Sequence, residues 1–523
     1  MRNALQIIGI VLILLPFYFF LYKIFSVRAL SFGCFDDCGN YMAGYFMNQG
    51  RVLYSEIFYN HIMGAAWLSY FIQKFHSSIN VYDLVLVHRQ VILIISFMFS
   101  VIFIKRFGWL GFYFIVFYEL SKFYFFGDRF LAESIVVFAA AYLVGVLFYK
   151  YQYKQLKTFD ILFSGFLTFL IIFLREPYIP LAVFLYTAIL YGKQYKKIKT
   201  VSIMIFLFLI FIVAINTQVK DFFFNDFTVN MQTAIKGEIG RNNTFGVGII
   251  QVFFYPVFIF MYGKINALRF FEVALSIAFI FGIVFVFLKK RKRTMAILVV
   301  LSLALANIRV TPPGTSYYEA YHMLVWYGMY IFITLALLMV LMKKYKKLGI
   351  ALSVILAVSW GYLVFLPGSY LYDKIDLQEQ LLTNFGNDMN IGNVINHLSD
   401  SSDTLFLDGG DDMIYWVSKR NSPYKYSLYT GVMPQIKLYK DARINMFKSD
   451  PPDFFYDFCS PRAPYNTQLP SFVKSSYVQL LYNGKPSCLY IRKEKMKKIT
   501  PAQWRAANEG FFSLSQNKEN KNE

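Results

Sequence analysis

Charged residues are scarce in this chain of 523 residues, and acids are scarcer than bases. Only 16% of the residues are charged, whereas an ordinary soluble domain carries about 25%. Hydrophobic residues make up 57% of the chain, and no charge occurs between Ala4 and Tyr22. A run of about 20 apolar residues spans the hydrocarbon core of a bilayer as a helix. The composition therefore argues against a soluble globular protein and indicates a membrane protein.

Several functional motifs are missing as well. The sequence has no internal repeat and no glycine-rich phosphate-binding loop, which leaves a transporter or an ATPase motor without positive support. It has no pair of cysteines and histidines spaced as in zinc sites. The first apolar run follows Arg2, as in a signal peptide, but it is long and lacks a small-x-small cleavage site. We therefore expect an uncleaved first membrane span.

The net charge of +21 comes mainly from short basic loops that separate apolar runs. Five such loops contain no acid, and their basic residues are Lys105 and Arg106; Lys150, Lys154 and Lys157; Lys193, Lys196, Lys197 and Lys199; Lys289 to Arg293; and Lys343, Lys344, Lys346 and Lys347. Loops of this kind are retained in the cytoplasm under the positive-inside rule. This distribution favours a membrane topology signal over nucleic-acid binding.

With those loops in the cytoplasm, the sequence predicts a polytopic α-helical membrane protein with about eleven transmembrane helices. The expected spans are 4–25, 82–104, 109–126, 133–149, 159–174, 178–192, 200–216, 270–288, 294–308, 320–342 and 348–366. The apolar segment 245–262 would put the basic cluster at 289–293 outside if it crossed, so we expect it to lie along the outer interface or to re-enter the membrane.

Two domains follow from this topology. The transmembrane domain covers residues 1–368 and carries outer loops 26–81 and 217–269, and residues 369–523 form a small extracytoplasmic α/β domain with a disordered tail from about 516. Within that domain we expect strands at 404–407, 477–481 and 488–491, and helices at 391–398 and 412–418.

All four cysteines lie outside in this topology, which permits disulfides between Cys34 and Cys38 and between Cys459 and Cys488. Free thiols remain the alternative.

The first outer loop contains the best candidates for chemistry. Asp36 and Asp37 follow the first span directly, and acids near the membrane boundary are costly unless they are solvated or paired. A structural interpretation is also open, because Asp is a good N-cap for a helix that runs through 41–47.

The spacing of the loop adds a resemblance. The acidic pair is followed by Tyr41, by Gly50-Arg-Val-Leu-Tyr54, by His61 at the start of an amphipathic helix, and by Arg89 in the second span. This pattern resembles the first periplasmic loop of GT-C membrane glycosyltransferases, such as the protein O-mannosyltransferases and aminoarabinose transferases. Those enzymes have Lys/His-Pro-Pro before the helix, whereas this chain has Asn60-His61-Ile62-Met63. The departure weakens the assignment of His61.

Two more segments share the resemblance. Gly127-Asp-Arg-Phe-Leu-Ala-Glu133 is similar to the acidic second loop of that class, and 309–326 (RVTPPGTSYYEAYHMLVW) is similar to its Tyr-rich stretch before a late span. The resemblance in architecture covers nearly the whole chain, including the small C-terminal domain, but the motifs cover only about 40 residues.

The resemblance implies transfer of a sugar from a polyprenyl-phosphate donor to a lipid, glycan or protein acceptor on the outer face of the membrane. It assigns the general base to Asp36, with Asp37 and Glu133 as supporting acids, and it leaves open a divalent metal held by these three carboxylates. The donor phosphate would contact Arg309, Arg175 and His61. Tyr41, Tyr54, Tyr318 and His322 would orient the acceptor or line the cavity.

Each candidate also has a structural interpretation. Arg89 would pair with Asp83 or extend toward the interface, Arg175 would be neutralised by Glu176, and Asp128 and Arg129 would form a surface pair. Tyr318 and His322 would belong to the interfacial aromatic belt.

Two other function classes remain open. One is an O-antigen polymerase or ligase, and the other is a non-catalytic transporter or flippase for a polysaccharide or lipid. All three classes place the protein in the cell membrane, and we expect the bacterial inner membrane, with the site on the periplasmic side.

Overall fold

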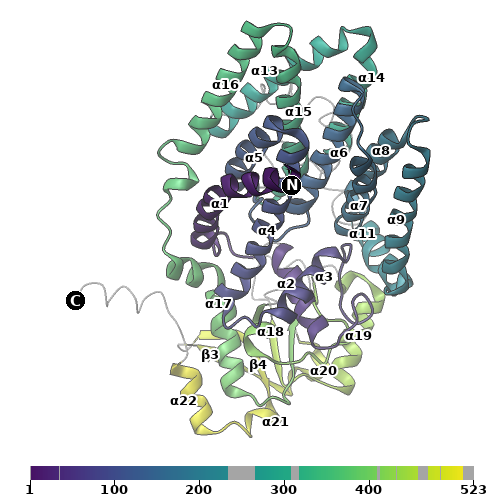
Figure 1. Ribbon diagram of the computed structural model, residues 1–523. Helices are drawn as coiled ribbons and strands as arrows, with labels where there is room; N and C mark the ends of the chain where they lie inside the picture. The colour runs from purple at the N-terminus through teal and green to yellow at the C-terminus, as the bar shows by residue number, and fades with distance from the viewer. Residues whose placement is uncertain are drawn as a thin grey trace. The chain divides into compact units, whose positions relative to one another are not determined.

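The computed structural model describes residues 2–34, 36–233, 266–307, 317–408, 413–430, 433–457, 469–482 and 485–509 (Figure 1). Helices dominate these residues. The chain divides into two compact units, and each is built from three separate stretches. The first unit takes residues 1–27, 88–216 and 239–374, and the second takes 28–87, 217–238 and 375–523.

Long apolar helices form the first unit. They are α1 (Arg2–Arg28), α4 (Val81–Phe107), whose first residues belong to the second unit, α5 (Trp109–Ser121), α6 (Glu133–Tyr153), α7 (Thr158–Leu174), α8 (Ile179–Leu190), α9 (Lys196–Ile215), α13 (Ala267–Phe287), α14 (Arg293–Ala306), α15 (Leu324–Met342) and α16 (Lys346–Phe365). Among the described residues, seven helical segments are long and apolar enough to cross a membrane. They are Leu5–Arg28, Val81–Phe107, Glu133–Tyr153, Lys196–Ile215, Ala267–Phe287, Ala320–Met342 and Lys346–Tyr372.

Each expected span overlaps one of these helices, but four of the helices are shorter than 18 residues. They are α5, α7, α8 and α14. The expected span 109–126 is interrupted, because α5 ends at Ser121 and a 3₁₀ turn, η1 (Lys122–Phe125), follows it. The segment 245–262 lies outside the described residues.

Helices α6 and α15 form the centre of the first unit. Most of the central part of each is buried, whereas α9 exposes most of its apolar surface. Glycines allow α6 and α15 to approach each other closely. A Cβ on Gly328 of α15 would lie 2.2 Å from the Val137 side chain of α6, and a Cβ on Gly145 of α6 would lie 2.8 Å from the rings of Phe107 and Phe332. Small residues at such contacts are typical of helices that pack within a membrane.

The second unit combines short helices with one sheet. Its helices are α2 (Asp36–Asn48), α3 (Gly64–Phe75), α10 (Val219–Phe222), the π-helical turn η3 (Phe223–Val229), α11 (Asn230–Thr233), α17 (Leu377–Leu398), α18 (Met413–Ser418), α19 (Lys437–Ser449), α20 (Ser471–Lys474), α21 (Lys493–Met496) and α22 (Pro501–Glu509). Its strands are β1 (Leu405–Asp408), β2 (Phe454–Asp457), β3 (Tyr477–Tyr482) and β4 (Lys485–Arg492). The strand order is β1-β2-β4-β3, with β1 and β2 parallel and the other pairs antiparallel.

The three strands and two helices expected from 391 onward are present, with β1 shifted by one residue and α17 beginning fourteen residues earlier than expected. Strand β2 was not predicted. Its four residues read Phe-Phe-Tyr-Asp, and the first three are buried. Such a short strand shows no alternation of polar and apolar residues from which it could be recognised.

Residues 56–58, between α2 and α3, pack in this second unit against residues of the C-terminal sequence. The amide of Phe58 donates to the carbonyl of Ser427 at 2.9 Å, and the amide of Ser427 donates to the carbonyl of Glu56 at 2.7 Å. The Phe58 ring joins an aromatic core with Phe406 and Tyr439. Backbone pairing and ring packing therefore fix residues 56–58 against the C-terminal sequence.

A disulfide joins Cys34 to Cys38 at the start of α2, which is one of the two alternatives that the sequence left open for these cysteines. Cys488 is also disulfide-bonded. Cys459 lies outside the described residues.

Candidate functional site

The two acids that follow the first span differ in exposure. Both lie in the first turn of α2, where the positive end of the helix dipole favours carboxylates. Asp36 is exposed, whereas Asp37 is only 1% exposed. The hydroxyl of Tyr41, one helical turn further on, donates to Asp37 Oδ2 at 3.0 Å. Asp37 is thus fixed inside the unit, and Asp36 remains open to molecules outside it.

The helix that carries these acids is held from a second side. The side-chain amide of Gln73 in α3 donates to the carbonyl of Tyr41 at 2.7 Å, and the hydroxyl of Tyr59 donates to Asn40 Oδ1 at 2.6 Å. Asn40, Tyr41 and Tyr59 are all buried. This arrangement gives α2 a fixed rotation about its axis, which determines that Asp37 faces inward.

His61 and Tyr54 are also brought together. The Tyr54 hydroxyl donates to the carbonyl of His61 at 2.9 Å, and the His61 ring meets the Tyr59 ring edge-on at 5.9 Å. We expected His61 to open a helix, but α3 begins only at Gly64. Residues 60–63 form an irregular segment before this helix.

In the first unit, Glu133 and Arg175 form a buried ion pair. Glu133 begins α6, Arg175 follows the last residue of α7, and Arg175 Nε lies 2.9 Å from Glu133 Oε1. Glu133 is 1% exposed and Arg175 4%. Glu133 is therefore an acidic partner of Arg175 that the sequence, which suggested Glu176, did not predict. The two helix ends meet across 42 residues of sequence, which no local pattern reveals.

The expected partners of Arg89 and Asp128 are also corrected. Arg89 Nη1 lies 3.8 Å from Asp128 Oδ2, whereas Asp83 accepts a contact at 3.0 Å from His76. Asp128 and Arg129 are both buried, so they do not form a surface pair. The Arg129 guanidinium lies over the Phe126 ring, 5.3 Å from its centroid.

His322 lies far from these residues in the sequence, in the 3₁₀ turn η6 (Tyr317–Met323). It is 9% exposed, its ring lies tilted against the Tyr321 ring with 4.2 Å between the centroids, and its carbonyl accepts a hydrogen bond from the Tyr178 hydroxyl at 3.2 Å. A position in the interfacial aromatic belt would leave the His322 side chain more exposed than this. Arg309 and the Tyr318 side chain lie outside the part of the chain that the structure describes.

Buried cations and anions are equal in number among the described residues of the first unit. The five cations are Arg89, Lys122, Arg129, Arg175 and Lys199, and the five anions are Glu119, Asp128, Glu133, Asp160 and Glu272. Buried ions in a mainly apolar unit are costly and are default candidates for a site. The guanidinium groups of Arg89, Arg129 and Arg175 have the geometry that suits phosphate.

Sequence reasoning missed another buried pair in the first unit. Glu119 of α5 and Lys122 of η1 lie three residues apart, at 2.8 Å, and both side chains are fully buried. Lys122 Nζ also donates to Ser96 Oγ of α4 at 3.2 Å. The signal was present in the sequence, since two ionisable residues fell within the expected span 109–126.

Metal binding receives no structural support from the described residues, where no group of three or more His, Cys, Asp or Glu side chains is placed to hold an ion. In comparisons with known proteins, no protein family, no curated protein and no solved structure matches this chain. The functional argument therefore rests on the chain's own residues.

Proposed function

We propose that this protein is a membrane glycosyltransferase that moves a sugar from a polyprenyl-phosphate donor to an acceptor hydroxyl at the outer face of the membrane. The observation that carries the proposal is the carboxylate pair of α2. One acid, Asp36, is exposed and able to meet a substrate, and the other, Asp37, is buried and bonded by Tyr41. This division of roles agrees with the resemblance to the GT-C loop, in which the first acid acts as the base.

The reaction needs one base and no general acid. The acceptor oxygen attacks the anomeric carbon, the bond from that carbon to the phosphate oxygen breaks, and the polyprenyl phosphate leaves with the electron pair. The Asp36 carboxylate takes the proton of the acceptor hydroxyl, which is a poor nucleophile until it is deprotonated. Phosphate is a stable anion, so the leaving group needs cations rather than a proton. Direct displacement inverts the anomeric configuration.

Asp37 and Tyr41 position this base rather than react. Their bond joins the first turn of α2 to the next turn, and buried hydrogen-bonded side chains hold a reacting group more precisely than a mobile loop does. Tyr41→Phe removes only this hydroxyl. We expect it to slow transfer less than Asp36→Asn does and to leave the pH dependence of transfer unchanged.

The donor phosphate is assigned to arginines. A guanidinium has five N–H donors, so Arg175 can bond Glu133 and a phosphate oxygen together. Arg309 has the same role in the resemblance. A charge-assisted contact contributes roughly 1.5–3 kcal/mol, so Arg309→Ala should slow transfer by about 10- to 150-fold. A wild-type rate for this variant would shift the role to Arg175 or His61.

The decisive experiment compares Asp36→Asn with the wild type. The purified proteins receive polyprenyl-phosphate donors with several radiolabelled sugars, and the label is followed into the lipid, glycan and protein fractions of membranes. Asn keeps the size of Asp but cannot take the proton, so transfer should fall about 10²–10⁴-fold. Asp83→Asn is the matched control, because Asp83 also lies in the first turn of a helix, α4.

Two results would reject the proposal. One is an Asp36→Asn variant that transfers at the wild-type rate, and a wild-type rate for Asp37→Asn as well would remove the whole acidic pair from the chemistry. The other is a wild-type protein that transfers no sugar from any donor tested. In the first case the acids serve the start of α2 and have no part in the chemistry.

Transport is the second candidate function, and the buried Glu119–Lys122 pair favours it. Ionisable residues inside a membrane often mark a transport path. A flippase would move a fluorescent polyprenyl-phosphate sugar across proteoliposome membranes without any acceptor, and Glu119→Gln would reduce that movement. If the protein is a transferase and not a flippase, Glu119→Gln should not change the rate of flipping.

A further inference from the structure

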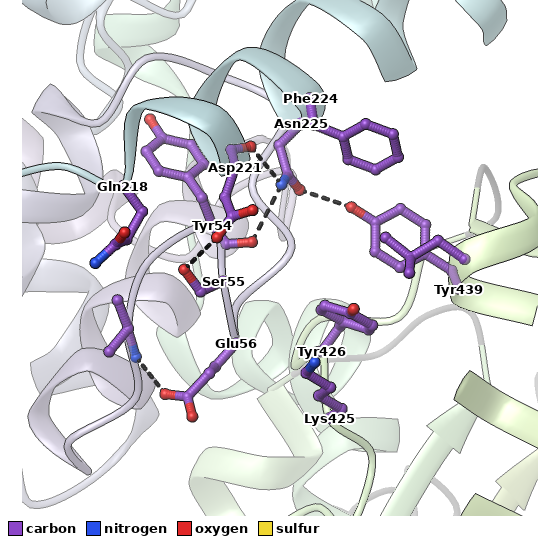
Figure 2. A pocket seen from close by; sticks show the side chains of 12 residues that line it. Tyr54, Ser55, Glu56, Gln218, Asp221, Phe224, Asn225, Lys425, Tyr426 and Tyr439 are labelled. Carbon is purple, nitrogen blue, oxygen red and sulfur yellow. Dashed lines mark hydrogen bonds between the residues drawn. The ribbon is translucent and has the colours of Figure 1, made fainter. Parts of the chain in front are cut away.

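A pocket of about 370 Å³ opens in the second unit. Three segments line it: residues 52–56 of the first outer loop, residues 218–225 of the second, and residues 425–439 near the C-terminal sheet (Figure 2). Small-molecule sites measure about 300–1,000 Å³, so this pocket suits a ligand at the small end of that range.

The back of the pocket is rigid. The Tyr439 hydroxyl donates to Asn225 Oδ1 at 2.9 Å, and Asn225 Nδ2 donates to the carbonyl of Tyr54 at 3.1 Å (Figure 2). The Tyr426 ring packs edge-on against Tyr439 at 4.9 Å. All four side chains are at least nine-tenths buried. The aromatic wall is therefore formed before any ligand arrives, which lowers the entropic cost of binding.

Polar groups cover the other sides. Asp221 Oδ2 accepts from Ser55 Oγ at 2.7 Å, and Glu56 Oε2 accepts from the amide of Val52 at 2.8 Å. Each carboxylate has a second oxygen and can accept more bonds. Gln218 and Lys425 are exposed where they line the pocket. The site thus offers both acceptors and donors around a hydrophobic wall.

We propose that this pocket binds a neutral saccharide. A sugar ring carries hydroxyls that donate to carboxylates and accept from amide and ammonium groups, and it has an apolar face that packs on tyrosine rings. Two carboxylates against one lysine leave the lining with net negative charge, which disfavours phosphate and other anions. The volume fits one ring or a short terminal unit rather than a long chain.

This inference does not depend on catalysis. It uses only the second unit's described residues, and it would hold for a transferase, a ligase or a transporter. Its test is therefore direct binding, so that an inactive protein can still confirm it and an active one can still overturn it.

The test uses the full chain in lipid nanodiscs that are free of sugar-based detergent, since such a head group would compete. Neutral disaccharides of glucose, galactose, mannose and N-acetylglucosamine are titrated into the protein, with hexose 6-phosphate as the anionic probe. Saturation-transfer NMR measures the binding of each. Leu438 lines the pocket and is 45% exposed, so Leu438→Trp fills the space without removing a hydrogen bond. We expect at least one neutral disaccharide to bind and Leu438→Trp to weaken it tenfold or more.

The matched control is Leu481→Trp, the same change at a leucine of β3 that is 67% exposed and does not line the pocket. It should bind as the wild type does. Asp221→Asn, which keeps the size of the side chain, should also weaken binding about tenfold. Three results overturn the proposal: no saturable binding of any neutral disaccharide, equal binding by wild type and Leu438→Trp, or tighter binding of the hexose phosphate.

Discussion

At the scale of single residues, burial decides what each ionisable group of this chain can do. Asp36 and Asp37 are neighbours in sequence, yet only one of them is exposed. Exposure suits a base that must reach a substrate, and burial suits a group that fixes geometry. Glu133 is buried together with its partner Arg175, so by the same reasoning it suits a role in fixing the geometry of the unit.

Removal of Glu133 alone should destabilise the protein. Glu133→Gln removes the charge that faces the buried Arg175 Nε at 2.9 Å, and breaking a buried pair in this way costs about 3–5 kcal/mol. The double variant Glu133→Gln/Arg175→Met removes both charges and should recover most of that loss. Thermal unfolding of the purified variants in one detergent measures both effects.

Glu494→Gln is the control for this comparison. Glu494 has a side chain that is 78% exposed and lies 3.8 Å from Arg492, and exposed pairs contribute only about 0–1 kcal/mol. Equal stability of Glu133→Gln and Glu494→Gln would show that the buried pair is not important for folding.

At the scale of secondary-structure elements, the sequence predicted what depends on neighbours in the chain. Apolar runs predicted the helices of the first unit, since hydropathy is a local property, and short strand-like runs predicted three of the four strands. The sequence did not predict contacts between distant elements. The partner of Arg175 lies 42 residues away, and the strand β2 is recognisable only beside β1 and β4. For the same reason, the loop acids could be proposed as a site but the pocket at Asp221 could not.

The packing of α2 on α3 gives a sharp test of this element. A Cβ on Gly44 would lie 2.5 Å from Ser69 Oγ and 2.7 Å from the backbone nitrogen of Tyr70, whereas a Cβ on Gly39 in the same helix meets nothing within 4 Å. Gly44→Ala should push the helices apart and cost about 1–3 kcal/mol. Gly39→Ala should instead stabilise the helix by up to about 1 kcal/mol. Thermal shifts of the same sign for both variants would contradict this packing.

The disulfide before α2 gives a second test at this scale. Cys34 and Cys38 close a very short loop, for which chain entropy predicts a stabilisation of about 2 kcal/mol. The double variant Cys34→Ser/Cys38→Ser should unfold at lower temperature and transfer sugar more slowly, because Asp36 lies inside the closed loop. A variant with wild-type stability and rate would show that the bond does not hold the acids in place.

Reduction of the wild-type protein is a less specific comparison, because Cys488 is disulfide-bonded too. The variant that lacks Cys34 and Cys38 leaves that second bond intact. The difference between the variant and the reduced wild type then reports what Cys488 contributes.

At the scale of the whole molecule, the basic loops of the first unit contact one another and the helix ends beside them. Arg106 binds Asp160 at the start of α7 at 2.7 Å, Lys150 donates to the carbonyl of Tyr191 at 2.6 Å, and Lys292 donates to the carbonyl of Gln152 at 2.9 Å. Lys343 lies over the Tyr153 ring at 4.9 Å. Glu133 and Arg175 occupy the opposite ends of α6 and α7. Loops that contact one another must lie on one side of a membrane.

We therefore propose the eleven-span topology, with these loops in the cytoplasm and residues after 367 outside. Fusions that end at Lys154 or Lys346 should make green fluorescent protein fluoresce and leave alkaline phosphatase inactive, because both positions adjoin basic loops that the positive-inside rule retains. A fusion that ends at Ser399, after α17, should give the reverse pattern. Both reporters are placed at all three positions, so that each site is its own control for expression. A fluorescent, phosphatase-negative fusion at Ser399 would put the C-terminal residues in the cytoplasm. The proposed topology has one span, 348–366, between Lys346 and Ser399, and this span carries the C-terminal residues to the outer side. A cytoplasmic Ser399 would therefore contradict a reaction at the outer face.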